Sequence, residues 1–308
     1  MNKVFETPIL LLLFNRPEET ALLWEKIKEI KPKNLYIAAD GPRPQNQDDQ
    51  KNCATTRKII TEGINWDCKL HFLFRDENLG CGVAIQSAIS WFFEQAPEGI
   101  ILEDDCLPHE DFFDFCEKLL ERYRNEKKVF MISGSCTPGN FQMTTSDDYL
   151  FTYVPSAWGW ATWRRSWNKY DFGLAELDNF EKEKIIVDLF PQKKHQQYWL
   201  NFFHEIKNKK INNWDYQLAF TSFKERGLCI RPKNNLVQNL GTTTINGKIK
   251  SIQTTSPLRI NKHPIEVAEN KQADEAIMKE LTAPLHQLKF ILKKIGIFYI
   301  LKNIHKNL

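Results

Sequence analysis

Four short apolar runs divide the first hundred residues, and polar residues follow each of them. They span residues 9–14, 35–39, 70–74 and 99–102. Continuous apolar runs of this length are typical of strands buried on both faces. Between the first two runs, Pro17 followed by two glutamates marks the start of a helix. Repetition of this scheme predicts a β-α-β-α-β-α-β order, a half-sheet of parallel strands with right-handed crossovers.

The pattern changes after residue 105. An apolar stripe predicts a helix over residues 109–125, and "KVFMISG" predicts a fifth strand. A charged helical region follows around residues 175–210, then a helix in "NNWDYQLAFTSFKERG" and a strand in "LCIRPKNNLVQNLG". The predicted fold class is therefore α/β, with a sheet that is parallel in the N-terminal half and flanked by helices.

Polar residues gather where the first four strands end. In open parallel sheets, ligands bind beyond the carboxyl ends of the strands. We therefore expect four clusters to meet at one rim of the sheet and to form a binding site. The four clusters are Asn15-Arg16, Asp40-Gly41, Arg75-Asp76 and Glu103-Asp104-Asp105.

The fourth cluster places three acids in a row, in the segment "GIILEDDCLP". Adjacent carboxylates at the end of a buried strand are costly unless a cation lies beside them. Strand alternation predicts that Glu103 and Asp105 face one way and Asp104 the other. One or two carboxylates together with diphosphate oxygens suit Mg²⁺ or Mn²⁺. The alternative is an acidic loop that is simply solvated at the end of a strand.

Composition narrows the class of protein. Lys and Arg number 42 against 39 Asp and Glu, a net charge of +3, so no overall field favours nucleic acid. The seven cysteines are scattered without a CxxC pair, which favours reduced thiols over a zinc site or a disulfide framework. No apolar run approaches the roughly 20 residues of a membrane span, and no signal peptide is recognisable. We expect a cytoplasmic protein.

The segment "GIILEDDCLPHEDFFDF" resembles the metal-binding strand of GT-A-fold glycosyltransferases. It is most similar to the N-acetylglucosaminyltransferase I family and its bacterial relatives, in which an acidic triplet follows an apolar strand. "FNRP" and "ADGPR" resemble nucleotide-contacting turns of that family, "WGWATW" an acceptor-side loop, and "NNWDYQL" a Trp-Asp segment. The resemblance covers residues 7–241 and implies a GT-A-like (Rossmann-like) mixed sheet, mostly parallel in the N-terminal half.

The resemblance implies a role for each matching residue. Asp105 would bind Mn²⁺ or Mg²⁺ directly, Asp40 would accept from the uracil N3–H, and Asp215 would be the general base. Donor-binding residues would be Asn15, Arg16, Asp40, Arg75, Glu103 and Asp104, and acceptor-side residues would be Trp158, Trp160 and Trp214.

Other roles for these residues stay open. Asp at a helix start is often an N-cap, which applies to Asp215. Large aromatic residues more often fill a core than a binding site, which applies to the Trp cluster at residues 158–167. Arg164 and Arg165 could meet an anionic acceptor or bridge neighbouring acids. The family pattern also has a metal- or phosphate-contacting His near the end of the domain, for which His263 is the nearest candidate here.

The predicted function is metal-dependent, inverting transfer of a sugar from a nucleotide donor, expected to be a UDP-sugar, to a hydroxyl of a glycan or lipid-linked acceptor. One alternative is a sugar-1-phosphate nucleotidyltransferase, although the Gly-rich loop of that class is missing after the first strand. Another is a non-catalytic nucleotide- or glycan-binding protein.

Three regions are predicted along the chain. Residues 1–241 form the catalytic domain, with a nucleotide-sugar half (1–106) and an acceptor half (107–241). Residues 242–272 form a lid or linker. Residues 273–308 form a basic amphipathic helix, which either packs on the domain or lies on the inner face of a membrane.

Overall fold

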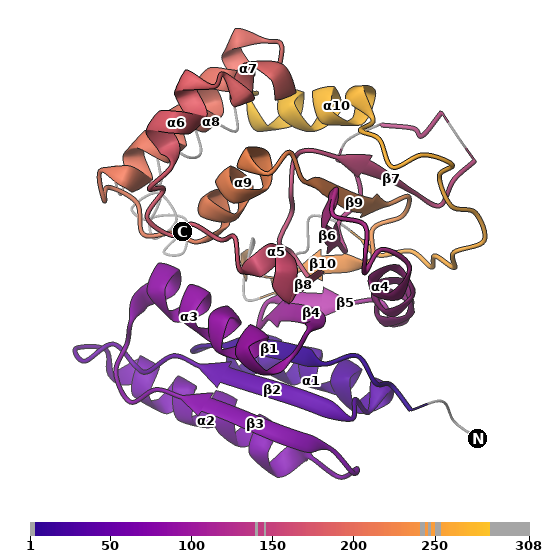
Figure 1. Cartoon of the computed structure of the whole chain (residues 1–308). Coiled ribbons are helices and arrows are strands. Elements are labelled where there is room, and N and C mark those ends of the chain that lie inside the picture. Colours follow the sequence, from indigo (N-terminus) through magenta and orange to yellow (C-terminus); the bar gives the residue numbers. More distant parts are fainter. Residues whose placement is uncertain are drawn as a thin grey trace.

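The computed structural model describes residues 4–138, 141–144, 146–240 and 254–283, and the backbone of 244–245 and 248–249. An eight-stranded sheet forms its centre (Figure 1). Across this sheet the strand order is β3 (Lys69–Phe74), β2 (Asn34–Ala39), β1 (Ile9–Leu13), β4 (Glu98–Glu103), β8 (Trp160–Trp163), β6 (Val129–Ser133), β9 (Leu228–Pro232) and β7 (Tyr149–Thr152).

Two kinds of strand pairing occur in this sheet. β3, β2, β1 and β4 are parallel throughout, which confirms the half-sheet predicted for the first 105 residues. β8 then pairs antiparallel with both β4 and β6, β6 and β9 are parallel, and β7 is antiparallel to β9. The predicted α/β class with a mixed sheet is confirmed. Two small antiparallel pairs accompany it, namely β5 (Cys106–Pro108) with β10 (Val237–Asn239), and β11 (Thr244–Ile245) with β12 (Lys248–Ile249).

Helices cover the sheet and form a further layer beside its C-terminal half (Figure 1). In chain order they are α1 (Pro17–Ile30), α2 (Gln47–Gly63), α3 (Gly80–Gln95), α4 (Glu110–Arg122), α5 (Arg164–Trp167), α6 (Leu177–Lys182), α7 (Ile185–Leu189), α8 (Lys193–Lys207), α9 (Asp215–Lys224) and α10 (Lys271–Leu281).

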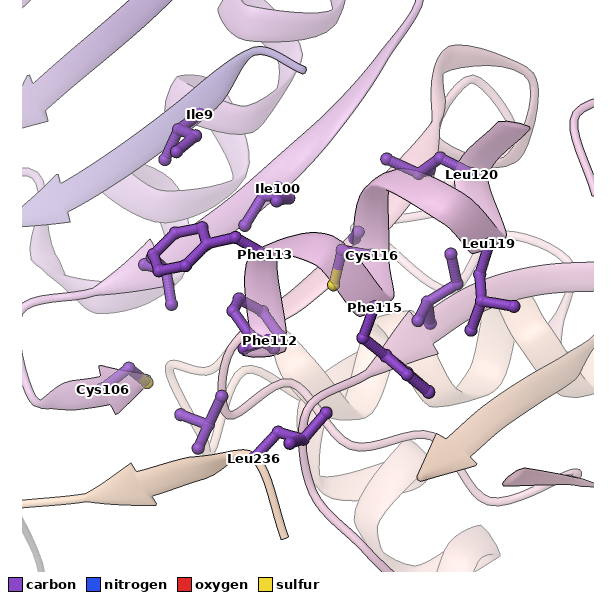
Figure 2. Close-up of a cluster of buried hydrophobic side chains, with 14 of the residues drawn as sticks. Ile9, Ile100, Cys106, Phe112, Phe113, Phe115, Cys116, Leu119, Leu120 and Leu236 are labelled. Carbon is purple, nitrogen blue, oxygen red and sulfur yellow. The ribbon is translucent and has the colours of Figure 1, made fainter. Parts of the chain in front are cut away.

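Alternating side chains of the central strands pack into two different hydrophobic cores, one on each face of the sheet. Ile9 and Leu11 on β1 pack with α1, α2 and α4, whereas Leu10 and Leu12 pack on the opposite face with α3. Figure 2 shows the first of these cores, where Phe112 and the other apolar side chains of α4 lie against the strands. Burial on both faces explains why these strands are uninterrupted apolar runs.

A third core lies among α6 to α10, away from the sheet. Its members include Phe203, Phe220 and Phe223, all fully buried. Aromatic side chains of this size each bury a large apolar area, so they stabilise the helical layer without a strand beneath it. This layer holds α9 and α10 in place beside the end of the sheet.

Asp274 fixes α10 to the chain that leaves β7. Its carboxylate accepts hydrogen bonds from the main-chain N–H of Tyr153 (3.0 Å) and of Val154 (3.2 Å). The side chain is buried, and burial raises the pKa of Asp274 to about 7 against the opposing effect of these two bonds. At any pH between its ordinary pKa and this raised pKa, the acid binds more protons in the folded state than in the unfolded state.

Stability is therefore expected to fall as pH rises from about 4, the ordinary pKa of Asp, towards 7. Asp274→Asn keeps an acceptor oxygen but removes the titration. In urea unfolding, we expect the free energy of unfolding of the variant, relative to that of the wild type, to increase by up to about 3 kcal/mol between pH 4.5 and 7.5. A wild-type-to-variant difference that does not change with pH would contradict this account of Asp274.

Residues 254–270 run along the domain as irregular chain. Leu258 is buried in the first core and its N–H donates to Asp111 (2.9 Å), while His263 Nδ1 lies 2.7 Å from the Tyr149 hydroxyl. These contacts place His263 beside β7 instead of among the acids. Whether the segment acts as a lid or a linker stays a prediction.

The predicted C-terminal helix falls mainly outside the described residues, which end at 283. Only its first part, α10, can be compared, and α10 packs on the domain. Among the described residues, none of the helices is long and apolar enough to cross a membrane.

Candidate functional site

A cavity of about 340 Å³ lies at the carboxyl ends of β1, β2 and β4, beside the start of α3. Residues from all four predicted polar clusters line it, so the expected convergence at one rim occurs. We call it the first cavity. Its polar lining consists of Arg16, Asp40, Arg43, Arg75, Asn78, Cys81, Glu103 and Asp104.

Arg16 is the cation beside the three acids. One nitrogen, Nη1, donates to Asp104 (2.9 Å) and also to Asp105 (2.7 Å). The Phe14 main-chain N–H adds a third hydrogen bond, to Asp104 (3.0 Å). The repulsion between adjacent carboxylates is therefore offset within the chain itself.

The predicted alternation of the acids is wrong beyond Glu103. β4 ends at that residue and a two-residue turn follows, so Asp104 and Asp105 both reach Arg16. Asp105 also accepts from the Asn239 side chain on β10 (3.3 Å) and does not line the first cavity. The turn, not the strand, decides where these two carboxylates point.

Glu103 is the acid without a partner. Among the described residues, none donates a hydrogen bond to its carboxylate. Burial raises its pKa well above the ordinary value, and the charges of Asp105, Asp104 and Asp215 raise it further. Burial likewise raises the pKa of Asp104 to about 6, although Arg16 opposes the shift. A bound cation or a hydrogen-bond donor would favour the charged form of Glu103.

Asp40 is saturated with hydrogen bonds. Oδ1 accepts from the N–H groups of Gly41 and Leu79, and Oδ2 accepts from the Asn78 side chain and the Gly80 N–H. These bonds hold the turn that begins α3. The resemblance implied that Asp40 accepts from a uracil N–H, but that N–H would have to displace an existing bond.

Asn15 points away from the cavity. Its side-chain amide donates to Asp49 on α2 (2.6 Å), and Asp49 in turn binds the Arg43 guanidinium. The bond from Arg43, with the smaller contribution of Asn15, lowers the pKa of Asp49 to about 2 despite burial. Asn15 thus positions Arg43, which faces the cavity and which sequence reasoning had quoted only within "ADGPR".

Arg75 lines the cavity as predicted. Its guanidinium donates to the Ser87 hydroxyl on α3 (2.8 Å), and burial lowers its pKa. Asn78 and Cys81 were not singled out from the sequence, because neither belongs to a strand-end cluster. The position of Gly80, at φ +75°, turns the chain so that both residues face the cavity.

A second cavity, also of about 340 Å³, adjoins the first. Glu103 lines both cavities, so the two spaces meet at this residue. The walls of the second cavity are mostly aromatic and apolar and come from the β7–β8 connection, α8, α9 and α10. Its aromatic and charged lining residues are Glu103, Trp158, Tyr198, Trp199, Trp214, Asp215, Tyr216, Arg231 and Glu280.

Asp215 is the first residue of α9, and its side chain is open to the second cavity. Although the side chain is exposed to the cavity, desolvation by the surrounding walls raises its pKa, against hydrogen bonds from the main-chain N–H groups of Tyr216 and Asp215 and from the Asn213 side chain. Trp214 is the N-cap residue of α9 and Asp215 the first helical residue, while the side-chain oxygen of Asn213 accepts from the N–H of Asp215 (3.0 Å) and of Trp214. Because the side chain is exposed and lines the cavity, the carboxylate of Asp215 is accessible to a ligand.

The α9 start is tied to the first cavity through Asn212. Its side-chain oxygen accepts from the Gly82 N–H on α3 (3.1 Å). A Cβ at Gly82 would lie 2.3 Å from that oxygen and 2.9 Å from the main-chain carbonyl oxygen of Asn213, so a larger residue would have to displace the chain at the start of α9. The contact fixes Asp215 relative to the rim of the sheet, across 130 residues of sequence.

The three predicted acceptor-side tryptophans differ in exposure. Trp158 is 40% exposed and lines the second cavity, whereas Trp214 lines it with only a small part of its surface. Trp160 is 1% exposed, stacks on Trp214 with ring centroids 5.9 Å apart, and belongs to β8 in the sheet. Trp160 is a core residue, and the acceptor-side role expected for it is not supported by this position.

The acids fit a metal ion only in part. No group of three His, Cys, Asp or Glu side chains suited to a metal occurs among the described residues. Asp104 and Asp105 converge as two ligands would, but the Arg16 guanidinium lies between them. A divalent ion would thus need to displace Arg16 from Asp105 and take further ligands from a diphosphate and water.

Comparisons with known proteins identify no family. No family model and no curated protein matches the chain. Many solved structures show distant similarity, and three of them serve as examples. HddC from Yersinia pseudotuberculosis is 13% identical over 52% of this chain and 77% of its own, with a TM-score of 0.33. S. aureus TarS 1–349 is 10% identical over 73% of this chain and 57% of its own, with a TM-score of 0.40. Mouse xyloside xylosyltransferase 1 is 11% identical over 69% of this chain and 80% of its own, with a TM-score of 0.33.

The chain thus spans little more than half of the TarS fragment. At these identities and TM-scores the similarities do not identify a function.

Proposed function

We propose that the protein transfers a sugar from a nucleotide donor to an acceptor hydroxyl. The observation that carries the proposal is the meeting of two unlike cavities at Glu103. The first has arginines and acids at the carboxyl ends of parallel strands, where nucleotides commonly bind. The second has aromatic walls and an available carboxylate, Asp215. A donor and an acceptor in these two spaces would touch at Glu103.

The first cavity would hold the nucleotide diphosphate and its sugar. Arg43 and Arg75 would bind the phosphates or the base through their guanidinium groups. Arg16 would give up its contact with Asp105 and bind the diphosphate instead. Glu103, which has no partner of its own among the described residues, would accept hydrogen bonds from hydroxyls of the donor sugar. This assignment puts the anomeric carbon at the junction of the two cavities.

Asp215 would act as the general base. It would take the proton of the acceptor hydroxyl as the oxygen attacks the anomeric carbon from the second cavity. As this bond forms, the bond between the anomeric carbon and the diphosphate breaks, and its electron pair leaves with the nucleoside diphosphate. Attack from the side opposite the leaving group inverts the anomeric configuration. The raised pKa of Asp215 makes it a better base than an ordinary carboxylate.

Mn²⁺ or Mg²⁺ is proposed as the cofactor, with Asp105 as its protein ligand. When bound, such an ion neutralises charge on a leaving diphosphate. The fit is partial because Arg16 already contacts the same carboxylate. A cytoplasmic location, at the inner face of a membrane or away from it, remains part of the proposal.

A thermal-shift screen tests the donor assignment. Purified protein is heated with UDP, GDP, dTDP or CMP, with the matching nucleotide-sugars and with nucleoside triphosphates, each with Mn²⁺ or with EDTA. A ligand at 100 times its Kd adds about 2.7 kcal/mol, which corresponds to a rise in Tm of about 5 °C for a protein of this size. We expect such a shift with one family of nucleoside diphosphates in Mn²⁺.

Two variants complete that screen. Asp105→Ala is expected to abolish the Mn²⁺-dependent part of the shift. Asp178→Ala, which removes an exposed acid paired with Lys207, is the matched control and keeps the shift. A shift that requires a nucleoside triphosphate would favour a nucleotidyltransferase, and no shift with any nucleotide would remove the basis of the proposal.

A further inference from the structure

The second cavity is short of usable positive charge. Three acids line it, Glu103 and Asp215 at the end nearest the first cavity and Glu280 on α10. Arg231 is the one cation among the described residues that line it. Three acids against one arginine favour a ligand without negative charge if the Arg231 guanidinium cannot reach that ligand.

Arg231 is fully engaged by the main chain. It lies on β9 and is 4% exposed. Nη1 donates to the carbonyl of Cys136 (3.1 Å), Nη2 to those of Val154 (3.1 Å) and Pro155 (3.3 Å), and Nε to Val154 (3.4 Å). These bonds hold together the connections that form the cavity wall. Moving the guanidinium toward a ligand would leave several buried carbonyl groups without partners, which is unfavourable.

The two arginines that could have met an anionic acceptor are engaged in the same way. Arg164 donates to the carbonyls of Ala96 and Glu94. Arg165 lies over the Trp163 ring and donates to four main-chain carbonyls, including that of Val129 (3.0 Å). Both side chains pack β8 and α5 against their neighbours, so neither supplies positive charge to the second cavity.

The walls fit a sugar ring. Trp158 presents an exposed aromatic face, and the hydroxyls of Tyr198 and Tyr216 lie 3.4 Å apart on the opposite elements, α8 and α9. Apolar C–H faces of a pyranose pack on aromatic rings, while its hydroxyls can bond to the tyrosine oxygens and to the hydroxyls of Ser135 and Ser156, which also line the cavity. A carboxylate or phosphate on that sugar would instead face Asp215 and Glu280, and like charges suppress binding.

We propose that the acceptor bound in the second cavity is a sugar residue without negative charge, neither a uronic acid nor a sugar phosphate. This inference rests on the proposed function and specifies its acceptor. Donor binding in the first cavity does not depend on it. The two can therefore fail separately.

The experiment uses saturation-transfer NMR on the whole protein with matched pairs of probes. The pairs are p-nitrophenyl glucoside with the glucuronide, and p-nitrophenyl galactoside with the galacturonide, which differ only at C6. We expect at least one neutral probe to bind about tenfold more tightly than its anionic partner. Trp158→Ala is expected to weaken binding of the neutral probe.

Glu280→Gln tests the electrostatic cause. It should improve binding of the anionic probe about threefold and leave the neutral probe unchanged, while Glu62→Gln on α2, an exposed acid far from the cavity, should alter neither. Equal or tighter binding of the anionic probe would overturn the inference. The absence of binding by every neutral probe would overturn it too. In that case, a nucleotide-dependent rise in Tm would show that the assignment of the first cavity to the donor is unaffected.

Discussion

Asp215→Asn is expected to lower the rate of sugar transfer about 10²- to 10⁴-fold, the usual contribution of a general base. Asn has nearly the same shape, so α9 should keep its start, where the main-chain N–H of residue 215 donates to the Asn213 side chain. Nucleotide binding should stay within about twofold of the wild type, because Asp215 lines only the second cavity. The measurements are kcat and KM for donor and acceptor, together with the nucleotide-dependent change in Tm.

Glu103→Gln is the comparison variant. Glu103 lines both cavities and is assigned to the donor sugar, so its substitution should raise the KM of the donor more than it lowers kcat. The rate of the wild type should also rise with pH as Asp215 loses its proton, and this rise should be missing from the residual rate of Asp215→Asn. Full kcat in the Asp215→Asn enzyme would exclude Asp215 as the base.

Asp40→Ala is expected to destabilise the protein by about 3 kcal/mol, even without nucleotide. The substitution removes a buried carboxylate that accepts from three main-chain N–H groups and the Asn78 side chain. Charge-assisted hydrogen bonds of this kind contribute about 1.5–3 kcal/mol each, and the N–H groups would lose their partner. Urea unfolding measures the effect, and Asp40→Asn, which keeps one acceptor oxygen, should fall between Ala and the wild type.

The opposite result has a clear meaning. If Asp40→Ala unfolds like the wild type but no longer binds nucleotide, the carboxylate serves the ligand and not the turn. The role that the family resemblance implied would then be restored.

The N-terminal half was predictable because its strands are buried on both faces. β1 was expected over residues 9–14 and spans Ile9–Leu13, and β4 was expected over 99–102 and spans Glu98–Glu103. Uninterrupted apolar runs between helix-start signals have few other interpretations. The same regularity predicted that Arg16, Arg75 and Glu103 would meet at one rim.

The C-terminal half was less predictable because its pairing is not local. β8 inserts antiparallel between β4 and β6, and "WGWATW" carries no period that distinguishes a strand from an aromatic loop. Trp160 was expected on the acceptor side but is a core residue, and the strand that carries it was not predicted. Pairing between β4 and β8 joins residues some 60 positions apart, which no local pattern encodes.

The site was predicted as a set of positions, not as a set of contacts. The need for a cation beside three acids was evident from charge alone, but the sequence did not show that Arg16 provides it. Nor could it show that Asn15 donates a hydrogen bond to Asp49, or that both carboxylate oxygens of Asp40 already accept hydrogen bonds from the chain. These contacts depend on the turn after β4 and on how α2 and α3 are positioned against the sheet.

The most direct test of the two-cavity account is a crystal structure with the nucleotide diphosphate selected by the thermal-shift screen and Mn²⁺. We predict the diphosphate in the first cavity, the metal on Asp105, and Arg16 moved away from that carboxylate. The sugar-bearing end should point to Glu103 and the second cavity. A nucleotide bound elsewhere, such as in the polar groove between α3 and α5 lined by Gln86 and Asn168, would contradict the account.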